Sequence, residues 1–560
     1  MIQTSYANHP LSQYKLFKIF LKSLVKKAKR LYNNGNNNFY RKGVKSMKQK
    51  HSYQYTFRSL LIRRMFISLL LLAQLLLIAV SVVHYSKMRW VAALLRGLAV
   101  LTALHLLTHR RPASFKISMV FLILLFPLFG GVFYWIFHFQ TTTVGFRRAL
   151  QKVQKDSETL YRRSDVPFDR AATQAPESAK LIHYLDTVPQ FPAYERTQTV
   201  FFTDGKEFQA DLLNELKQAR HYIFLEFFII GEGVFWDSVL EVLRERVHAG
   251  VDVRVIYDDL GCFATLPHRY KKKLQSYGIS CRVFNPFRPF LTSIQNNRDH
   301  RKIAIIDGKI AFTGGMNLAD EYINERERFG HWKDSAIKLS GNGAWSFTVM
   351  FLQMWSFLTS KPVDWDAYIP SFENTSSPEC GLVQPFSDSP MDREAVAEQV
   401  YLQIINNARN YLYITTPYFM VDDNMQAALK CAAKSGVDVR MILPHRPDKP
   451  MVHFTTRSYY RELLSAGIKI YEYSDGFIHS KNMVADDLVA CVGSVNLDFR
   501  SLYMHFECGT CLYRTPSIPC IREDFLQTLE HCQPVTVKDC KVGPIKKLLQ
   551  DICRLFAPMM

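Results

Sequence analysis

The stretch DHRKIAIIDGKIAFTGGMNLADEY at residues 299–322 decides the fold, because its pattern returns as FIHSKNMVADDLVACVGSVNLDFRS at residues 477–501. Each stretch reads His-x-Lys, four residues, Asp, six residues, Gly, two residues and Asn. The matching residues are His300, Lys302, Asp307, Gly314 and Asn317 in the first copy, and His479, Lys481, Asp486, Gly493 and Asn496 in the second. Two copies with identical internal spacing indicate an internal duplication.

Each copy predicts a β-hairpin. An apolar run follows the Lys, an Asp-Gly or Asp-Asp pair interrupts it, and a second apolar run leads to the Gly. Because residues two apart on a strand point to the same face, the His and Lys of each copy should project together. Two such hairpins brought side by side would surround one pocket with two imidazoles and two ammonium groups.

The duplication extends over whole domains. Upstream of each motif lies a helical run and then an apolar strand, YIFLEFFII in the first half and YLYITTPYF in the second. Each half continues through a helix into a second strand, VDVRVIYD or VDVRMILP. Strands that alternate with helices predict an α/β fold. We therefore expect two tandem α/β/α domains, at residues 196–375 and 376–560, that form one pseudo-symmetric catalytic unit.

Apolar segments ahead of the repeat predict a membrane anchor within residues 65–139. The runs at residues 65–86 and 117–139 are long enough to cross a bilayer as helices. The apolar stretch at residues 90–108 is either a third span or an interfacial helix. Residues 140–195 are polar and are interpreted as a linker.

The two ends of the chain predict membrane contact of another kind. Residues 1–64 contain 15 Lys and Arg and no Asp or Glu, so they carry most of the formal net charge of +20. This basic extension favours an anionic surface as its partner over nucleic-acid binding by the core. Residues 14–31 within it are either an amphipathic surface helix or a solvated tail. Residues 544–560 predict an amphipathic helix that contacts the membrane or docks on the catalytic domain.

The basic extension and the cysteines together predict the orientation. The basic extension places the N-terminus in the cytoplasm by the positive-inside rule. Two spans would return the chain to the cytoplasm, whereas three would place the rest outside. The 11 Cys residues lie after the apolar segments without a framework spacing, which favours the reducing cytoplasm. Cys508 and Cys511 have the spacing of a redox or zinc pair, but they lie in an apolar strand-like run and are interpreted as core residues.

The repeated residues suit covalent chemistry on a phosphodiester. One imidazole can attack phosphorus, and the other can protonate the leaving oxygen and later deprotonate the incoming alcohol. Lys302, Lys481, Asn317 and Asn496 can hold the non-bridging oxygens. This chemistry requires no metal and no cofactor, and no cluster of carboxylates or His residues in the sequence calls for one.

Other residues of the motifs and their surroundings have alternative roles. Asp307 and Asp486 lie at the hairpin ends, where they serve either the chemistry or the turn. The two Gly residues of the pattern are expected to permit close backbone approach. Glu507, on the strand after the second motif, could orient a His by accepting its second N–H, and Asp334 has the comparable place after the first motif.

The two stretches resemble the HKD motifs of the phospholipase D superfamily. Within it, the chain from residue 65 onward resembles bacterial cardiolipin synthases in its apolar N-terminal segments, the patterns LEFFII and TTPYF, and the C-terminal RLFAPMM. The resemblance implies that two phosphatidylglycerol molecules give cardiolipin and glycerol, with His300 as nucleophile and His479 as acid. It also implies a multi-pass protein of the bacterial cell membrane, with its catalytic domains on the cytoplasmic side, whose partners are phosphatidylglycerol and other anionic lipids.

Three other functions remain open at this point. A phospholipase D, or another phosphatidyltransferase such as a phosphatidylserine synthase, would use the same residues with a different acceptor. A nuclease of the superfamily would explain the basic charge, but that charge lies in the extension, so nucleic acid is not expected as a partner. A non-catalytic membrane scaffold would explain the helices but not two intact motifs. The oligomeric state is not determined by the sequence.

Overall fold

The computed structural model describes residues 85–109, 112–138, 141–162, 166–286, 293–370, 381–392 and 394–560, together with 65, 68, 69, 71–74 and 76. The basic extension and its possible helix at residues 14–31 therefore lie outside the described residues. Most of the first apolar run, at residues 65–86, lies outside them as well.

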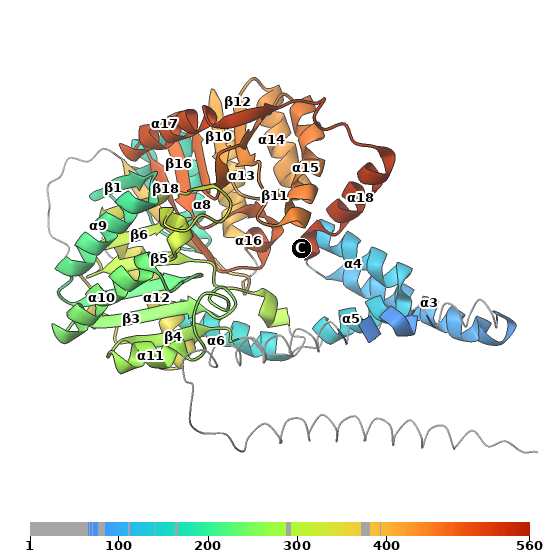
Figure 1. Ribbon diagram of the computed structural model, residues 1–560, viewed down its shortest axis with the longest axis horizontal. Coiled ribbons are helices and arrows are strands. Elements are labelled where there is room, and N and C mark those ends of the chain that lie inside the picture. The colour runs from blue at the N-terminus through green and yellow to red at the C-terminus, as the bar shows by residue number, and fades with distance from the viewer. Residues whose placement is uncertain are drawn as a thin grey trace, which may run out of the picture. The chain divides into compact units, whose positions relative to one another are not determined.

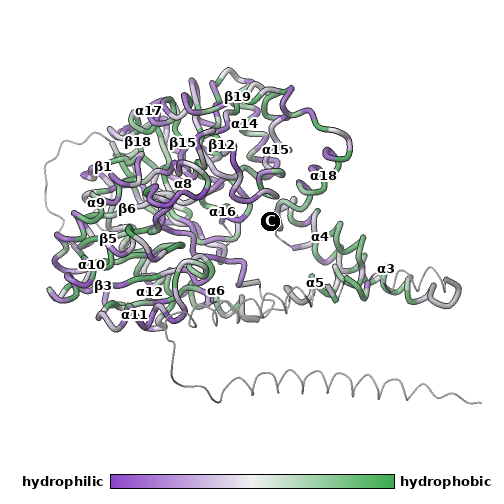
Figure 2. The backbone as a smooth tube through the Cα atoms, viewed as in Figure 1, coloured by the Kyte–Doolittle hydropathy of each residue, from purple (hydrophilic) through white to green (hydrophobic). Residues whose placement is uncertain are grey.

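From Tyr85 onward, the described residues form three apolar helices ahead of the sheets, namely α3 (Tyr85–Thr108), α4 (Ala113–Leu125) and α5 (Pro127–His138) (Figure 2). The sequence predicted one continuous helix near residues 117–139, and this is wrong in that the run divides at Phe126. Pro127 lacks a backbone N–H and disfavours a helical conformation at the preceding residue. A Cβ on Gly130 would lie 2.6 Å from the carbonyl oxygen of Leu122, so only glycine allows α5 to approach α4 this closely.

Among the described residues, one helical segment is long and apolar enough to cross a membrane, Trp90–Thr108 within α3. This is the stretch that the sequence presented as a third span or an interfacial helix. Its inner face packs with α4 and α5 through a small apolar cluster that includes Leu106, Ile123 and Tyr134. The three helices therefore form one packed unit, and large apolar side chains such as Leu94, Leu101 and Leu104 are exposed on its outer side.

The segment interpreted as a polar linker is folded. It contains α6 (Thr141–Ser157), α7 (Phe168–Gln174) and α8 (Ala179–Thr187), with short 3-10 turns between them. Tyr161 donates a hydrogen bond to Gln353 at 3.0 Å, and Leu181 and Leu185 are fully buried in the main core. The interpretation as a linker is corrected here, because apolar residues at helical spacing within this polar stretch give it a buried face.

The first half of the repeat is a mixed sheet of seven strands, in the order β1-β8-β6-β5-β2-β3-β4 (Figure 1). Its strands are β1 (Thr197–Phe202), β2 (Tyr222–Phe227), β3 (Asp252–Asp258), β4 (Ser280–Phe284), β5 (Lys302–Ile306), β6 (Ile310–Gly314) and β8 (Ala336–Gly341). All six residues of β2 are buried, as expected for an apolar strand covered on both faces. The outer face is covered by α9 (Gly205–Gln218), α10 (Val234–His248) and α11 (Tyr270–Ser276).

The second half repeats this sheet with one strand more, in the order β19-β13-β12-β10-β15-β16-β18-β9. Its strands are β9 (Leu382–Asp388), β10 (Tyr411–Thr415), β12 (Asp438–Pro444), β13 (Lys469–Tyr473), β15 (Asn482–Ala485), β16 (Val489–Gly493), β18 (Glu507–Tyr513) and β19 (Cys532–Val535). Its helices are α13 (Val396–Asn407), α14 (Asp423–Lys434), α15 (Pro450–Ser465), α16 (Phe499–Tyr503) and α17 (Ser517–Leu529), and α18 (Pro544–Leu555) follows.

The two sheets confirm the predicted duplication. Read in opposite directions, β1-β8-β6-β5-β2-β3-β4 matches β9-β18-β16-β15-β10-β12-β13 strand for strand. Both motifs form the expected antiparallel hairpins, β5–β6 and β15–β16. The long helix α12 (Ala344–Thr359) is buried from Ala344 to Ser356, where it packs against the first sheet and against β9 of the second. The α/β fold with two tandem domains is therefore confirmed.

Backbone pairing joins the two halves where the motifs begin. The short strands β7 (His331–Lys333) and β14 (Gly476–Ile478) pair in parallel across the halves. A second parallel bridge joins Asp299 to Phe506. Each motif therefore begins beside a strand that belongs to the other half.

Candidate active site

Each motif histidine is held by a carboxylate from the opposite half of the molecule. The Nδ1 of His300 lies 2.9 Å from Oε1 of Glu507, and the Nδ1 of His479 lies 2.6 Å from Oδ2 of Asp334. All four side chains are buried. The structure thus brings the two motifs and the segments that carry Glu507 and Asp334 into one composite site.

Backbone hydrogen bonds join the same pairs of segments across the two halves. The N–H of His300 donates to the carbonyl of Phe506 at 2.9 Å, and the N–H of His479 donates to the carbonyl of Lys333 at 2.7 Å. In each case the acceptor immediately precedes the carboxylate that binds the imidazole. Two hydrogen bonds from one residue fix both the position and the orientation of each ring.

The carboxylates also decide the tautomer of both rings. An ionised carboxylate only accepts hydrogen bonds, so Nδ1 must carry the proton and Nε2 must present its lone pair. Burial alone would raise the pKa of Glu507, but its hydrogen bond from His300 and the nearby Lys302 hold the pKa below its usual range. His479 and Lys481 likewise outweigh burial and lower the pKa of Asp334.

Burial lowers the pKa of His300 to about 3 and that of His479 to about 4, although the carboxylate beside each ring raises it. Lys302 lowers the pKa of both rings further. Both imidazoles are therefore neutral near pH 7, so that Nε2 of either ring is available as a nucleophile or a base.

The two motif lysines are buried beside these rings. Lys302 Nζ donates to the carbonyl of His300 at 2.5 Å, and Lys481 Nζ donates to the carbonyl of His479. Burial lowers the pKa of Lys302 to about 8 and that of Lys481 to about 7. A buried ammonium group gains most from an anionic ligand, so the pair is suited to a phosphate.

The two motif asparagines differ in their surroundings. Asn317 Oδ1 accepts from the backbone N–H of Ile229 at 2.9 Å, and its Nδ2 donates to the hydroxyl of Tyr322 at 2.7 Å. Asn496 is equally buried, but within the described part of the chain its Oδ1 has no hydrogen-bond partner. Asn317 is therefore part of a fixed network, and Asn496 is the more available amide.

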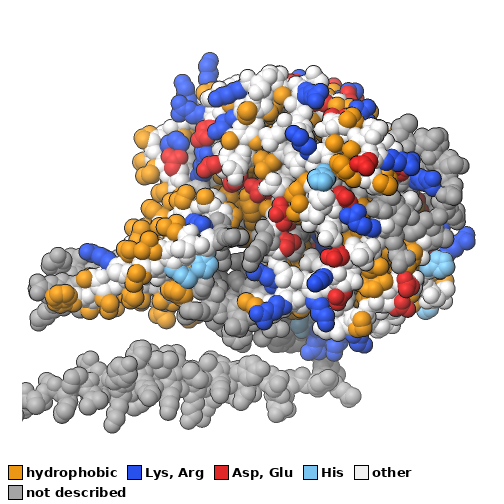
Figure 3. Space-filling model, turned by 180° about the vertical axis from the view of Figure 1, so that it is seen from behind, with side chains coloured by type: hydrophobic (Ala, Val, Ile, Leu, Met, Phe, Trp, Pro, Cys, Tyr) orange, Lys and Arg blue, Asp and Glu red, His pale blue; other side chains and the backbone are white. Residues whose placement is uncertain are grey.

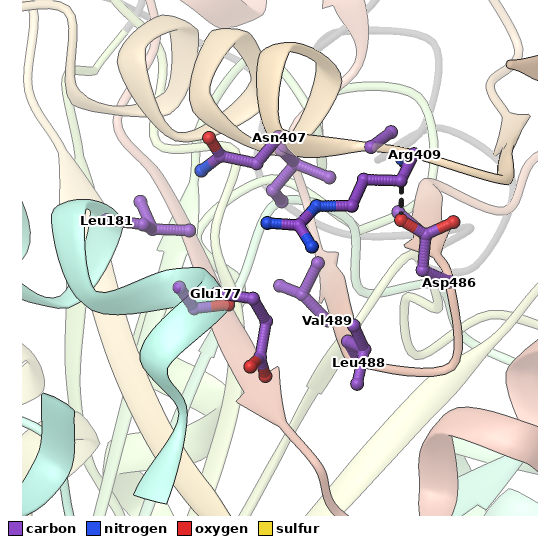
Figure 4. A pocket seen from close by; sticks show the side chains of 11 residues that line it. Glu177, Leu181, Asn407, Arg409, Asp486, Leu488 and Val489 are labelled. Carbon is purple, nitrogen blue, oxygen red and sulfur yellow. Dashed lines mark hydrogen bonds between the residues drawn. The ribbon is translucent and has the colours of Figure 1, made fainter. Parts of the chain in front are cut away.

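The motif aspartates bind backbone rather than the histidines or lysines. Asp307 accepts from the N–H groups of Arg220, His221 and Tyr222 at 2.8 Å each, at the start of β2. Asp486 accepts in the same way from the residues that begin β10, and Figure 4 shows it beside Arg409. These contacts tie the turn of each hairpin to the neighbouring strand.

Close packing at the site depends on glycines. A Cβ on Gly314, which has a φ of +148°, would lie 2.5 Å from the carbonyl oxygen of Ser335, and one on Gly493 would lie 2.5 Å from that of Cys508. A Cβ on Gly315 would lie 2.0 Å from Oδ1 of Asp334. The sequence predicted close backbone approach at Gly314 and Gly493 but did not single out Gly315.

Sequence reasoning missed the aromatic surroundings of the two imidazoles. His505 and Phe228 lie beside His300, with ring centroids 5.6 Å and 5.0 Å away, and Trp332 lies 5.2 Å from His479. The position of His505, two residues before Glu507, was the available signal, because alternate residues of an extended segment share a face.

The site favours an anion over a cation. Among the described residues, the ligand atoms of His300, His505 and Glu507 lie within 4.8 Å of one another and could hold a metal ion. Lys302 and Lys481 contribute ammonium groups to the same site, and a divalent cation would be repelled by them. The residues present therefore fit a phosphate better than a metal.

A buried ion pair supports the loop that leads to the first motif. Arg298 lies 2.9 Å from Asp258, and both side chains are almost fully buried. Asp258 also accepts from the N–H of Asp299 at 3.1 Å, one residue before His300. This pair fixes the entry to β5 from the end of β3.

Comparisons with known proteins agree with this geometry. Residues 212–332 and 401–529 match the family described as "Cardiolipin synthase, PLD-like domain", and residues 97–137 match "Phospholipase_D-nuclease N-terminal". A cardiolipin synthase of Geobacillus thermodenitrificans is 34% identical over 464 residues, which cover 81% of this chain and 90% of that protein. The chain belongs to the cardiolipin synthase family. It is thus an enzyme of phosphatidyl transfer, and the non-catalytic scaffold is excluded.

Two further proteins are similar to the chain, one in sequence and one in fold. An uncharacterized protein of Streptococcus mutans serotype c is 41% identical over 465 residues, covering 82% of this cardiolipin synthase family member and 99% of that protein. The crystal structure of a phosphatidylserine synthase from Haemophilus influenzae Rd KW20 superposes with a TM-score of 0.50 at 16% identity, covering 65% of this chain and 94% of that one. At that identity the second likeness concerns the fold alone.

Proposed function

We propose that this protein is a membrane-bound phosphatidyltransferase that makes cardiolipin and glycerol from two phosphatidylglycerol molecules through a covalent phosphatidyl-histidine intermediate. The observation that carries the proposal is the pair of crossed His–carboxylate contacts, each beside a buried lysine, in a chain of the cardiolipin synthase family. The catalytic residues proposed are His300, His479, Lys302 and Lys481.

In the first half-reaction the phosphodiester of phosphatidylglycerol lies between the two imidazoles. Its negative charge raises the pKa of the neighbouring His479, which can then bind a proton. Nε2 of His300 attacks phosphorus, the bond from phosphorus to the glycerol oxygen breaks, and His479 gives its proton to that oxygen. Glycerol leaves, and the phosphatidyl group remains on His300.

In the second half-reaction a hydroxyl of another phosphatidylglycerol takes the place of glycerol. His479 now removes the hydroxyl proton while the oxygen attacks phosphorus, and the bond from phosphorus to Nε2 of His300 breaks. Cardiolipin forms, and His479 holds the proton with which the cycle began. Lys302 and Lys481 neutralise the charge on the non-bridging oxygens in both steps, and Nδ2 of Asn496 donates a hydrogen bond to them.

The remaining predicted residues support these groups. We assign Glu507 and Asp334 to holding the tautomer and orientation of the imidazoles, and Asn317 to the network around Tyr322 and the phosphate. We assign Asp307 and Asp486 to tying the hairpin turns to β2 and β10, because their carboxylates bind backbone amides there.

The membrane location belongs to the same proposal. Helix α3 offers an apolar segment long enough to cross a bilayer, and both proposed substrates are lipids. The ten cysteines within the described part of the chain are free, which favours a reducing compartment. We therefore place the protein in the cell membrane with its catalytic domains on the cytoplasmic side. This orientation makes it a multi-pass protein, because a second span beside α3 is needed to return the chain to the cytoplasm.

The test uses the full chain reconstituted in vesicles of phosphatidylglycerol, with lipid products followed by mass spectrometry. Cardiolipin with an equal amount of free glycerol supports the proposal. Phosphatidic acid without cardiolipin would show water as the acceptor, and a new phosphatidyl ester formed only with an added alcohol would show another transferase. Either outcome would overturn the assigned acceptor.

The roles of the two histidines are tested separately. His300→Ala and His479→Ala should each abolish transfer, and a phosphatidyl group should remain on the protein only in His479→Ala. Label trapped in His300→Ala but not in His479→Ala would invert the assignment. Glu472→Gln is a matched control, because Glu472 is also buried against a histidine, His445 at 3.0 Å, in the second domain.

A further inference from the structure

Helix α18 is amphipathic, but its apolar face is exposed and its polar face is the one that contacts the domain. Its apolar residues recur at positions i, i+3, i+4 and i+7, which place them on one face. These residues are Ile545, Leu548, Leu549 and Ile552, and between 44% and 76% of the surface of each is exposed. In a soluble domain such a face packs on the core, whereas here it faces away from it.

The polar face of α18 is the one that contacts the catalytic half. Gln550 is buried, and Arg554 lies 2.7 Å from Glu462 of α15 and donates to Gln426 of α14 at 2.9 Å. The guanidinium of Arg554 also lies over the ring of Tyr459, 4.3 Å from its centroid. The helix is therefore held by polar contacts in a position that leaves its apolar face outward.

The end of α18 contacts the apolar helix α4. Ser118 Oγ donates to the carbonyl of Leu555 at 2.5 Å, and the rings of Phe121 and Phe556 lie edge to face with centroids 6.0 Å apart. Met559 packs against the apolar cluster of α3–α5. In Figure 3, hydrophobic side chains gather over these helices and continue toward the C-terminal helix. The exposed faces of α4 and α18 are therefore parts of one apolar surface.

We infer that α18 is a membrane-surface helix whose outward face is covered by the acyl chains of an anionic phospholipid bilayer, beside α4. Continuity with α4 and the neighbouring segment long enough to span a bilayer argue for lipid as the occupant. Lys546 is exposed beside the apolar face, where it meets anionic headgroups, whereas Lys547 pairs with Asp551 on the other face. This inference rests on the membrane location in the proposed function, not on the reaction.

The residues after α18 connect this membrane contact to the active site. Arg500 Nε donates to the carbonyl of Met560, and Ala557 is buried. Arg500 belongs to α16, four residues after the motif residue Asn496. Contact of α18 with the bilayer therefore fixes the segment that follows the second motif relative to the lipid surface.

The experiment is photolabelling of the full wild-type chain in vesicles of phosphatidylglycerol and phosphatidylethanolamine that contain a lipid with a diazirine on its acyl chain. Peptide mapping should find label on Ile545, Leu548, Leu549 and Ile552 at least about tenfold above that on the polar face, the factor expected from the transfer free energy of one buried leucine. Label on α3 and α4 reports the membrane location independently.

Three results would overturn the inference. Label on α3 and α4 but not on α18 would show that the helix lies off the bilayer. Label on none of the three would overturn the membrane location itself, and thus part of the proposed function. Absence of label on α18 that reverses when the protein is diluted in the vesicles would show a second copy of the chain as the occupant.

A variant pair extends the test to activity. Leu548→Glu with Leu549→Glu should lose the label on α18 and reduce cardiolipin formation on vesicles at least about tenfold, with the thermal midpoint unchanged. The matched control, Lys547→Gln with Asp551→Asn, changes the exposed ion pair at 2.7 Å on the other face and should keep both label and activity. Equal loss in both double variants would overturn the inference.

Discussion

Glu507→Gln tests whether the two halves of the chain share one catalytic unit. Glu507 lies 207 residues from His300 in sequence, yet its carboxylate binds the Nδ1 of that ring. It also accepts from the hydroxyl of Ser494. Glutamine has the same size and keeps one acceptor oxygen, so the substitution removes the charge with little change in packing.

The expected loss follows from these contacts. A hydrogen bond to a charged group contributes about 1.5–3 kcal/mol, which corresponds to about 10- to 150-fold in rate. Removing the carboxylate that orients a catalytic histidine costs up to about 10⁴-fold in the serine proteases. Because Ser494 has a second acceptor, the carbonyl of Cys508 at 3.2 Å, the amide can still turn its oxygen toward His300. We therefore expect kcat to fall on the order of 10²-fold, which is within the range for one hydrogen bond to a charged group and well below the loss in the serine proteases.

The assay is the initial rate of glycerol release by the full chain in phosphatidylglycerol vesicles. Glu472→Gln, which removes a buried carboxylate bound to His445 outside the site, serves as the control and should keep kcat within about twofold. Combining Glu507→Gln with His300→Ala should cost no more than His300→Ala alone, because residues that act as one unit are not additive.

Two results would refute this reasoning. A kcat within about threefold of the wild type would show that Glu507 does not act on the imidazole. A large loss of kcat together with a large loss of thermal stability would show that the carboxylate holds the fold rather than the ring. A fall in kcat with the thermal midpoint unchanged, and none in the control, is the result that the geometry predicts.

Three further predictions concern other groups. Asp307→Asn and Asp486→Asn should each lower the free energy of unfolding by about 1–3 kcal/mol, because the hydrogen bonds to three backbone amides become weaker, and kcat per folded molecule should change little. A loss of kcat at full stability would instead show that these carboxylates take part in the reaction. Because burial lowers the pKa of Lys481 to about 7, its ammonium is lost as pH rises, so kcat/KM should fall between about pH 7 and 9. Lys481→Arg should shift this fall in the pH profile to higher pH, and an unshifted profile would contradict the proposed role of Lys481. Arg298→Met should destabilise the protein by about 3–5 kcal/mol in urea denaturation, because it leaves Asp258 buried without its partner, and a change below about 1 kcal/mol would show that the pair is dispensable.

The sequence could predict the features that depend on local spacing. The repeated pattern marks the residues that we propose to react, the alternation of strands and helices gives the two α/β halves, and the apolar run followed by an Asp turn gives each hairpin. These signals lie within a few tens of residues, where side-chain periodicity and turn chemistry decide the backbone. The amphipathic spacing at residues 544–560 likewise predicted the helix that became α18.

The sequence predictions were less accurate where a single proline ends a helix or where a mostly polar segment has one buried face. A single run at residues 117–139 is apolar throughout, but Pro127 divides it into α4 and α5. The polar average of residues 140–195 concealed the apolar faces of α6 and α8, which pack into the main core. The average composition of a segment hides an apolar face when polar residues cover the rest of each helix, yet that apolar face is the one that becomes buried.

What the sequence by itself determined is therefore which groups we propose to react: two histidines and two lysines, which suit phosphodiester chemistry. Only the tertiary structure decided which carboxylate serves which histidine, since Glu507 and Asp334 lie 207 and 145 residues away from their partners. It also decided that the motif aspartates bind backbone and that α18 turns its apolar face outward. The physical reason is that such pairings arise from the packing of two sheets against each other, and no local pattern records which strand of one half will lie beside the motif of the other.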